Sequence, residues 1–170
     1  FHNFCDGCFA SDAYILPSGH TEDEILEDPR WENNEVACYF GLDYVIINNS
    51  FKNIISREEG CFDEKCTVVL TTGGSDPKGI LLDLLEWSRN VDSTKYKIIA
   101  LYGKAFKHQS ELIRVQSTLP AFIELKPFDP EEFGNADIVF TTFGVTVYEL
   151  IYLSRLILTI GHTKRHALLG

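Results

Sequence analysis

Hydrophobic and polar positions alternate along residues 67–170 in a way that predicts five short strands separated by helices. The strands are compact runs of β-branched and other apolar residues, each bounded by Gly, Pro or polar residues. We expect them at residues 67–72, 96–102, 121–125, 137–142 and 156–160. Apolar residues at helical spacing predict a first helix that opens at Asp76-Pro77 and runs to Trp87. Further helices are expected at 106–117 and 145–153, with a helical turn at 130–133 and a last helix from Thr163.

This alternation of strand and helix predicts an α/β fold in which a parallel sheet is covered on both faces. Right-handed crossovers then favour a doubly wound, Rossmann-like sheet. Ligands of such sheets bind beyond the carboxyl ends of the strands. Two glycine bends follow strands at that edge, Gly73-Gly74 after the first strand and Phe143-Gly144 after the fourth. We therefore expect the binding site at these two bends.

The first 48 residues do not show this pattern. Strands are expected at 12–16 and 43–48, and residues 18–36 between them are acidic and polar, as in a surface excursion. Nothing in this stretch completes a domain. We interpret residues 1–48 as the remnant of a preceding lobe with its crossing segment, and residues 49–170 as the main domain, truncated at its C-terminus.

Composition excludes several classes of protein. Hydrophobic residues make up 45% of the 170 residues, which is typical of a globular chain and not of a disordered one. A formal net charge of -10 argues against nucleic acid as a partner, because Lys and Arg must neutralise phosphates. Ser154 and Arg155 interrupt the longest apolar stretch, so no membrane span and no signal peptide are expected.

The cysteines are five, an odd number in a chain long enough to fold without disulfides. We expect reduced thiols and a cytoplasmic protein. The pair Cys5-x-x-Cys8 leaves a zinc or redox role open, but the second pair, Cys61 and Cys66, has four residues between its members and no nearby His. Structural thiols are the simpler interpretation, with neither metal nor cofactor.

The bend after the first strand reads Gly73-Gly74-Ser75-Asp76 and is followed by Pro77. Two glycines let the backbone turn sharply and approach a ligand closely, and consecutive N–H groups can bind an anion. The bend can equally be a tight turn in which Ser75 or Asp76 caps the next helix. It matches neither the P-loop nor the dinucleotide fingerprint.

The second bend has the same design. Thr142 ends a strand, and Gly144, Val145 and Thr146 begin a helix whose N–H groups can contact a phosphate. Glu149 lies one turn after Thr146, where its carboxylate can accept hydrogen bonds from the two hydroxyls of a ribose. The alternative is structural, because Thr146-x-x-Glu149 also has the spacing of a capping box.

The ordered set of these motifs resembles the nucleotide-binding lobe of GT-B glycosyltransferases. The set comprises the segment 73–77, Asp137-Ile138-Val139 and Gly144-x-Thr146-x-x-Glu149. The resemblance is greatest to the UDP-sugar hydrolase of pseudaminic acid biosynthesis and to spore-coat polysaccharide biosynthesis proteins. The segment 41–44 with Phe51 is similar to the stretch that precedes the glycine bend in these proteins.

The resemblance implies a UDP-sugar as ligand, with the N-terminal lobe of the same protein as partner. The bend at 73–76 would face the diphosphate, residues 144–146 would donate to phosphate, and Glu149 would bind the ribose. Phe128 and Asp129 would lie near the base, and His162 and Thr163 near the sugar. The activity implied for the whole protein is glycosyl transfer or UDP-sugar hydrolysis in surface-glycan biosynthesis.

Two departures from the resemblance limit this expectation. Family members carry a Gln where this chain has Thr163, and Thr lacks the separate donor and acceptor of an amide. The catalytic base of the relatives lies in an N-terminal lobe whose glycine-rich loop and His are not in this sequence. No catalytic residue is therefore assigned, and we expect binding without turnover.

Three alternatives stay open. The fold can serve as a non-catalytic module that has lost sugar binding. Asp76 and Glu149 can form a hydrolytic pair of carboxylates. His162 and His166, four residues apart, can bind a metal on one helix face, although no third ligand is visible.

Overall fold

The computed structural model describes residues 6–17, 27–32, 34–55 and 65–161. The chain divides into two compact units, Phe1–Ile46 and Ile47–Gly170. No helix in the described ranges is both long enough and apolar enough to cross a membrane. Each unit is described separately below.

The first unit contains a pair of parallel strands with aromatic packing. Its elements are η1 (Asp6–Ala10), β1 (Ala13–Leu16), η2 (Pro29–Trp31), β2 (Ala37–Phe40) and η3 (Leu42–Tyr44). The strands pair in register from Ala13 opposite Ala37. The ring of Trp31 lies 4.3 Å from that of Phe9 and 5.8 Å from that of Tyr14, measured between centroids.

One predicted strand of this unit is wrong. Residues 43–48 form the end of η3 and an extended segment, and the second strand is instead β2 at Ala37–Phe40. The four residues of β2 are too few to show an alternating pattern, and their pairing with β1 decides the structure. Tertiary pairing therefore overrides the local preference of residues 43–48.

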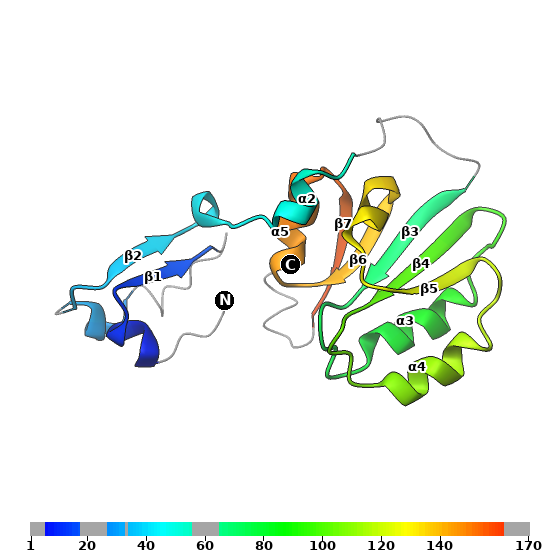
Figure 1. The fold of residues 1–170 in the computed structure, drawn as a ribbon, viewed down its shortest axis with the longest axis horizontal. Helices are drawn as coiled ribbons and strands as arrows, with labels where there is room; N and C mark the ends of the chain where they lie inside the picture. The colour runs from blue at the N-terminus through cyan, green and yellow to red at the C-terminus, as the bar shows by residue number, and fades with distance from the viewer. Residues whose placement is uncertain (1–5, 18–26, 33, 56–64, 162–170) are drawn as a thin grey trace. The chain divides into compact units, whose positions relative to one another are not determined.

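The second unit is the α/β domain. Its elements are α2 (Asn49–Lys52), β3 (Cys66–Thr71), α3 (Ile80–Ser88), β4 (Tyr96–Tyr102), α4 (Gln109–Gln116), β5 (Ile123–Pro127), η4 (Pro130–Asn135), β6 (Ile138–Thr142), α5 (Val145–Tyr152) and β7 (Leu156–Ile160). The five strands are all parallel and lie in the order β5-β4-β3-β6-β7 (Figure 1). The predicted doubly wound, Rossmann-like fold is confirmed.

Helices cover both faces of this sheet because alternate strand residues point to opposite faces. On one face, α3 and α4 pack through Leu81, Leu85 and Leu112 in a buried cluster that includes Val68 and Leu70 of β3. Figure 1 shows these two helices side by side. The intervening β3 residue, Val69, is also fully buried but belongs to the cluster of the other face.

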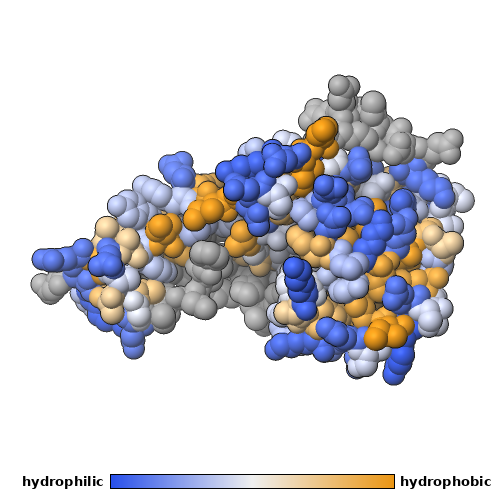
Figure 2. Space-filling model, viewed as in Figure 1, coloured by the Kyte–Doolittle hydropathy of each residue, from blue (hydrophilic) through white to orange (hydrophobic). Residues whose placement is uncertain are grey.

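That other face is covered by α5, α2 and η4. Leu150 of α5, Phe51 of α2 and Phe133 of η4 share the buried cluster with Val69. The rings of Phe51 and Phe133 stack with their centroids 5.8 Å apart, so the two short elements pack directly on one another. On the outer surface drawn in Figure 2, hydrophilic side chains are interspersed with smaller hydrophobic patches.

Most predicted elements of this unit agree with the structure, with shifted bounds at three of them. The helix predicted to open at Asp76-Pro77 begins only at Ile80, after the N-cap Gly79. The strand predicted at 121–125 is β5 at Ile123–Pro127, and the helix predicted from Phe106 begins only at Gln109. Residues 103–107 instead form a loop that hydrogen-bonds to the bend after β3. The helix predicted from Thr163 lies outside the described residues.

The order in which the chain adds strands to the sheet changes side once. From β3 the chain adds β4 and then β5 on one side, and afterwards β6 and β7 on the other. The carboxyl ends of β3 and β6, which flank this switch point, are paired with Thr71 opposite Thr141. The bends that follow the two strands therefore begin side by side, where ligands of open α/β sheets bind.

Asp137 fastens the opposite end of the same strand pair. Its Oδ2 accepts a hydrogen bond of 2.7 Å from the backbone N–H of Thr67, and its own N–H donates to the Thr67 carbonyl at 2.9 Å. The motif residue Asp137 thus acts in the fold, because it lies at the amino-terminal edge of the sheet, away from the two bends.

Replacing Asp137 should therefore destabilise the domain. We expect Asp137→Ala to lower the free energy of unfolding by about 1–3 kcal/mol, because the Thr67 N–H loses a charged acceptor. Asp137→Asn keeps an acceptor oxygen and should lose less. Guanidinium unfolding followed by circular dichroism measures both, and equal stability of the two variants and the parent would contradict this role.

Candidate functional site

The two predicted bends lie close together at the carboxyl edge of the sheet. A Cβ placed on Gly73 would stand 3.9 Å from Oγ1 of Thr142, which is van der Waals distance. Gly73 has a φ of 80°, a conformation that favours glycine and lets β3 turn sharply. The structure thus brings together the residues predicted at 73–76 and at 142–146.

Asp76 is bonded to the start of α3. Its Oδ1 accepts from the N–H of Ile80 at 3.0 Å, and its Oδ2 accepts from the N–H of Leu81 at 2.8 Å and from Oγ1 of Thr72 at 2.9 Å. The residue is only 1% exposed. The N-cap residue of α3 is Gly79, and the carboxylate of Asp76, three residues earlier, accepts from the first N–H groups of the helix and offsets its positive end.

Gly103 locks the first bend in place. A Cβ on Gly103 would stand 2.4 Å from the carbonyl oxygen of Gly74 and 2.7 Å from that of Gly73. The carbonyls of Gly74 and Ser75 accept hydrogen bonds, both of 3.1 Å, from the N–H groups of Ala105 and Lys107. The loop after β4 therefore fixes the backbone of the bend after β3.

The start of α5 differs from that of α3. Gly144 is its N-cap, with an extended φ of 175°, and no side chain caps the helix. The capping box between Thr146 and Glu149 is therefore not formed, because Thr146 lies inside the helix and not at its N-cap. Among the described residues, no carboxylate is hydrogen-bonded to the first N–H groups of this helix, where the helix dipole places a partial positive charge.

Two glycines of the bends have no structural need to be glycine. A Cβ on Gly74 or on Gly144 would meet nothing within 4 Å, and neither residue has a positive φ. Within the described part of the chain, the N–H groups of Gly74, Ser75, Val145 and Thr146 have no hydrogen-bond acceptor. Open space thus lies next to unused donors on both bends.

Glu149 is buried beside this edge, on the second turn of α5. It is 7% exposed, and burial raises the pKa of its carboxyl above the ordinary value of 4.5, while a hydrogen bond from the Asn48 backbone opposes that rise. A carboxylate offers about four acceptor positions, so one bond leaves capacity for a ligand.

Phe128 and Asp129 lie at the same edge, after β5. The N–H of Phe128 donates to the Tyr102 carbonyl at 2.8 Å, and its ring is 37% exposed and tilted against Phe133. Asp129 caps η4, since its Oδ1 accepts from the Glu131 N–H at 3.0 Å. The exposed ring and the Phe128 carbonyl are the groups left for a base.

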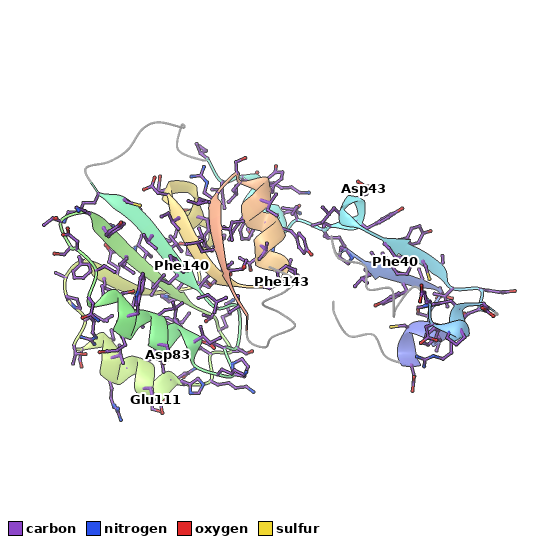
Figure 3. The ribbon with its side chains drawn as sticks, turned by 180° about the vertical axis from the view of Figure 1, so that it is seen from behind. Phe40, Asp43, Asp83, Glu111, Phe140 and Phe143 are labelled. Atoms are coloured by element: carbon purple, nitrogen blue, oxygen red, sulfur yellow. The ribbon has the colours of Figure 1, made fainter. Side chains whose placement is uncertain are left out.

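The hydrolytic pair of Asp76 and Glu149 is not formed. Asp76 is bonded to α3, which packs on one face of the sheet, whereas Glu149 belongs to α5, which packs on the other. Figure 3 labels Phe143 at the turn between β6 and α5, and Asp83 on α3 on the other side of the sheet. The two carboxylates therefore do not face one another.

Several candidates carry no further evidence. His162, Thr163, His166, Cys5 and Cys61 lie outside the described residues. Of the three cysteines that the structure describes, Cys8 is buried, Cys66 is half-buried and Cys38 is exposed. Among the described residues, no group of three or more His, Cys, Asp or Glu side chains is arranged to hold a metal ion.

Gly103 and Asn48 contribute to the site but were not predicted from the sequence. Gly103 directly follows β4, much as Gly73 follows β3, and this position after a strand could have indicated a third bend at the same edge. Asn48 bonds to Glu149 through its backbone N–H, so the type of residue at position 48 does not reveal this contact. No protein-family model matches the chain, and no curated protein matches it.

The contrast between Gly103 and Gly144 can be tested with one substitution at each. Gly103→Ala must displace the backbone of the first bend and should lower the free energy of unfolding by about 1–3 kcal/mol. Gly144→Ala enters open space with an ordinary φ and should stay within about 0.5 kcal/mol of the parent. Chemical denaturation of both proteins decides, and the reverse order would refute this assignment.

The raised pKa of Glu149 predicts a pH-dependent stability. Ionising a carboxyl whose pKa is higher in the folded state than in the unfolded chain destabilises the fold as the pH rises. The neutral Glu149→Gln variant should therefore be more stable than the parent at about pH 7.5, and the difference should fall away below pH 4.5.

The measurement is guanidinium unfolding of parent and Glu149→Gln at about pH 4 and about pH 7.5. A stability difference that is the same at both pH values would show that Glu149 does not titrate with a raised pKa.

Proposed function

We propose that the second unit binds a UDP-sugar at the carboxyl edge of its sheet, as part of a GT-B-type glycosyltransferase or UDP-sugar hydrolase in surface-glycan biosynthesis. The observation that supports this most is the open space beside Gly74 and Gly144 at two adjacent strand ends. Glycines that neither conformation nor packing requires are expected where a ligand approaches the backbone.

A diphosphate suits the donors at these bends. The free N–H groups of Gly74 and Ser75 belong to the first bend, and those of Val145 and Thr146 to the uncapped start of α5. A helix start of this kind attracts an anion through both its N–H groups and its dipole. The start of α3 offers no such attraction, because Asp76 already occupies it.

The sugar of a nucleotide suits Glu149. A carboxylate accepts hydrogen bonds from adjacent hydroxyl groups, and it repels a phosphate. Glu149 lies one turn along α5 from Thr146, so a ligand with its phosphate at the helix start can place its ribose near this carboxylate. Its energetically unfavourable burial is what a binding residue, not a structural one, is expected to show.

Uracil as the base and a sugar on the diphosphate rest on the resemblance described above. Phe128 supports a planar base, since its ring is partly exposed at the same edge. Catalysis in the full protein would draw on the N–H groups of the bends to stabilise the departing diphosphate. These residues bind and orient, and the catalytic base is not assigned to this chain.

Calorimetric titration with UDP tests the proposal. We expect Glu149→Gln to raise Kd roughly 5- to 150-fold, the equivalent of about 1–3 kcal/mol, because the ribose loses a charged acceptor. Gly144→Ala should also weaken binding, since its methyl group stands beside the helix start. Glu111→Gln on α4, which packs on the opposite face, is the control and should bind as the parent does.

Binding and stability of Glu149→Gln should change in opposite directions at neutral pH. A structural residue would show the two falling together. No heat with the parent at millimolar UDP would contradict the proposal and favour the non-catalytic module.

A further inference from the structure

The loop after β4, residues 103–107, lies against the bend that is proposed to face the diphosphate. We propose that this loop is a second wall of the nucleotide site, in which Lys104 and Lys107 attract the negative charge of the diphosphate. The inference rests on the proposed function and assigns to it two residues outside the predicted motifs. Its support comes from backbone geometry, from charge and from ion pairing.

The backbone geometry places the loop at the site. β4 pairs with β3 in parallel, with Leu101 opposite Thr71, so both strands end at the same edge. Gly103 packs directly on Gly74, and the N–H of Lys107 donates to the Ser75 carbonyl at 3.1 Å. The two lysines are thus held next to the first bend by fixed backbone contacts.

The charge of this corner is opposite to that of the chain. Residues 73–79 and 103–107 contain three lysines, Lys78, Lys104 and Lys107, and one acidic residue, Asp76. The whole chain has a net charge of -10. The carboxylate of Asp76 is buried and bonded to α3, so it does not screen the lysines at the surface.

Lys104 and Lys107 differ in their ion pairing from the lysines on the neighbouring strands β4 and β5. Nζ of Lys97 lies 2.9 Å from Glu124, and Nζ of Lys126 lies 2.8 Å from both Glu124 and Glu132. In the described part of the chain, Lys104 and Lys107 have no acidic partner, and both are exposed. Their charge is therefore available to a ligand.

A ligand with more negative charge gains more from such a wall. Affinity should rise from uridine to UMP to UDP, and the gain should shrink as salt screens the lysines. The two lysines matter for diphosphate affinity, whereas Glu149 matters for all three ligands through the ribose. The two contributions can therefore be separated by the choice of ligand.

The experiment compares the full chain with the double variant Lys104→Gln/Lys107→Gln by calorimetry with UDP, UMP and uridine at low and moderate salt. We expect the Kd for UDP to rise about tenfold at low salt, with a smaller rise for UMP and none for uridine. The control with the same net charge is Lys52→Gln/Lys65→Gln, two exposed lysines at the end of α2 and at the amino edge of β3.

Each outcome decides. If the double variant binds UDP like the parent, or no more weakly than the control, the lysine wall is overturned while the nucleotide site stands. An equal loss for UDP, UMP and uridine indicates a displaced bend and also overturns it. If the parent itself does not bind UDP, the proposed function fails, and the inference that rests on it fails with it.

Discussion

The parallel pairing of β3 with β6 is the constraint on which the candidate site depends. This pairing holds Thr71 and Thr141, which are far apart in sequence, opposite one another at the carboxyl ends of the two strands. Asp137 fastens the far end of the same pair through the backbone of Thr67. With that register, two bends that are unrelated along the chain lie side by side, and their N–H groups can serve one anion.

The glycines around this edge are of two kinds, those that the fold requires and those that it does not require. Gly73 has a backbone conformation that favours glycine, and Gly103 leaves no room for a Cβ against the neighbouring bend. Gly74 and Gly144 meet neither condition. The helix starts differ in the same way, because Asp76 accepts from the first N–H groups of α3, whereas no described side chain does so at α5. These facts together are the basis on which we propose an anion site at this edge.

Much of the second unit could be predicted from sequence because its central strands β3 and β4 are largely buried. A run such as 67–72 must be apolar on both faces of a parallel sheet, and its glycine bend marks its end. The short strand β2 could not be predicted, since only pairing with β1 defines it. The start of α4 was misplaced for a similar reason: hydrogen bonds from residues 105 and 107 to the first bend hold that segment out of the helix.

The candidate site was predictable in its position but not in its internal roles. Spacing alone could not decide whether Asp76 and Glu149 were caps or ligands, since both interpretations use the same residue types. In the structure, Asp76 accepts from an N–H group at the start of α3, and Glu149 does not form a capping box because the N-cap of α5 is Gly144. Backbone partners such as Asn48 leave no trace in the sequence, because every residue type except proline offers the same N–H group.

Amide chemical shifts during titration with UDP test the central claim most directly, because they report on the N–H groups themselves. The account predicts that the largest changes in a ¹H–¹⁵N spectrum fall on Gly74, Ser75, Gly144, Val145 and Thr146. The amino-terminal edge, at Thr67 and Asp137, should not respond. Changes confined to one bend, or centred on the amino-terminal edge, would contradict a shared anion site between β3 and β6.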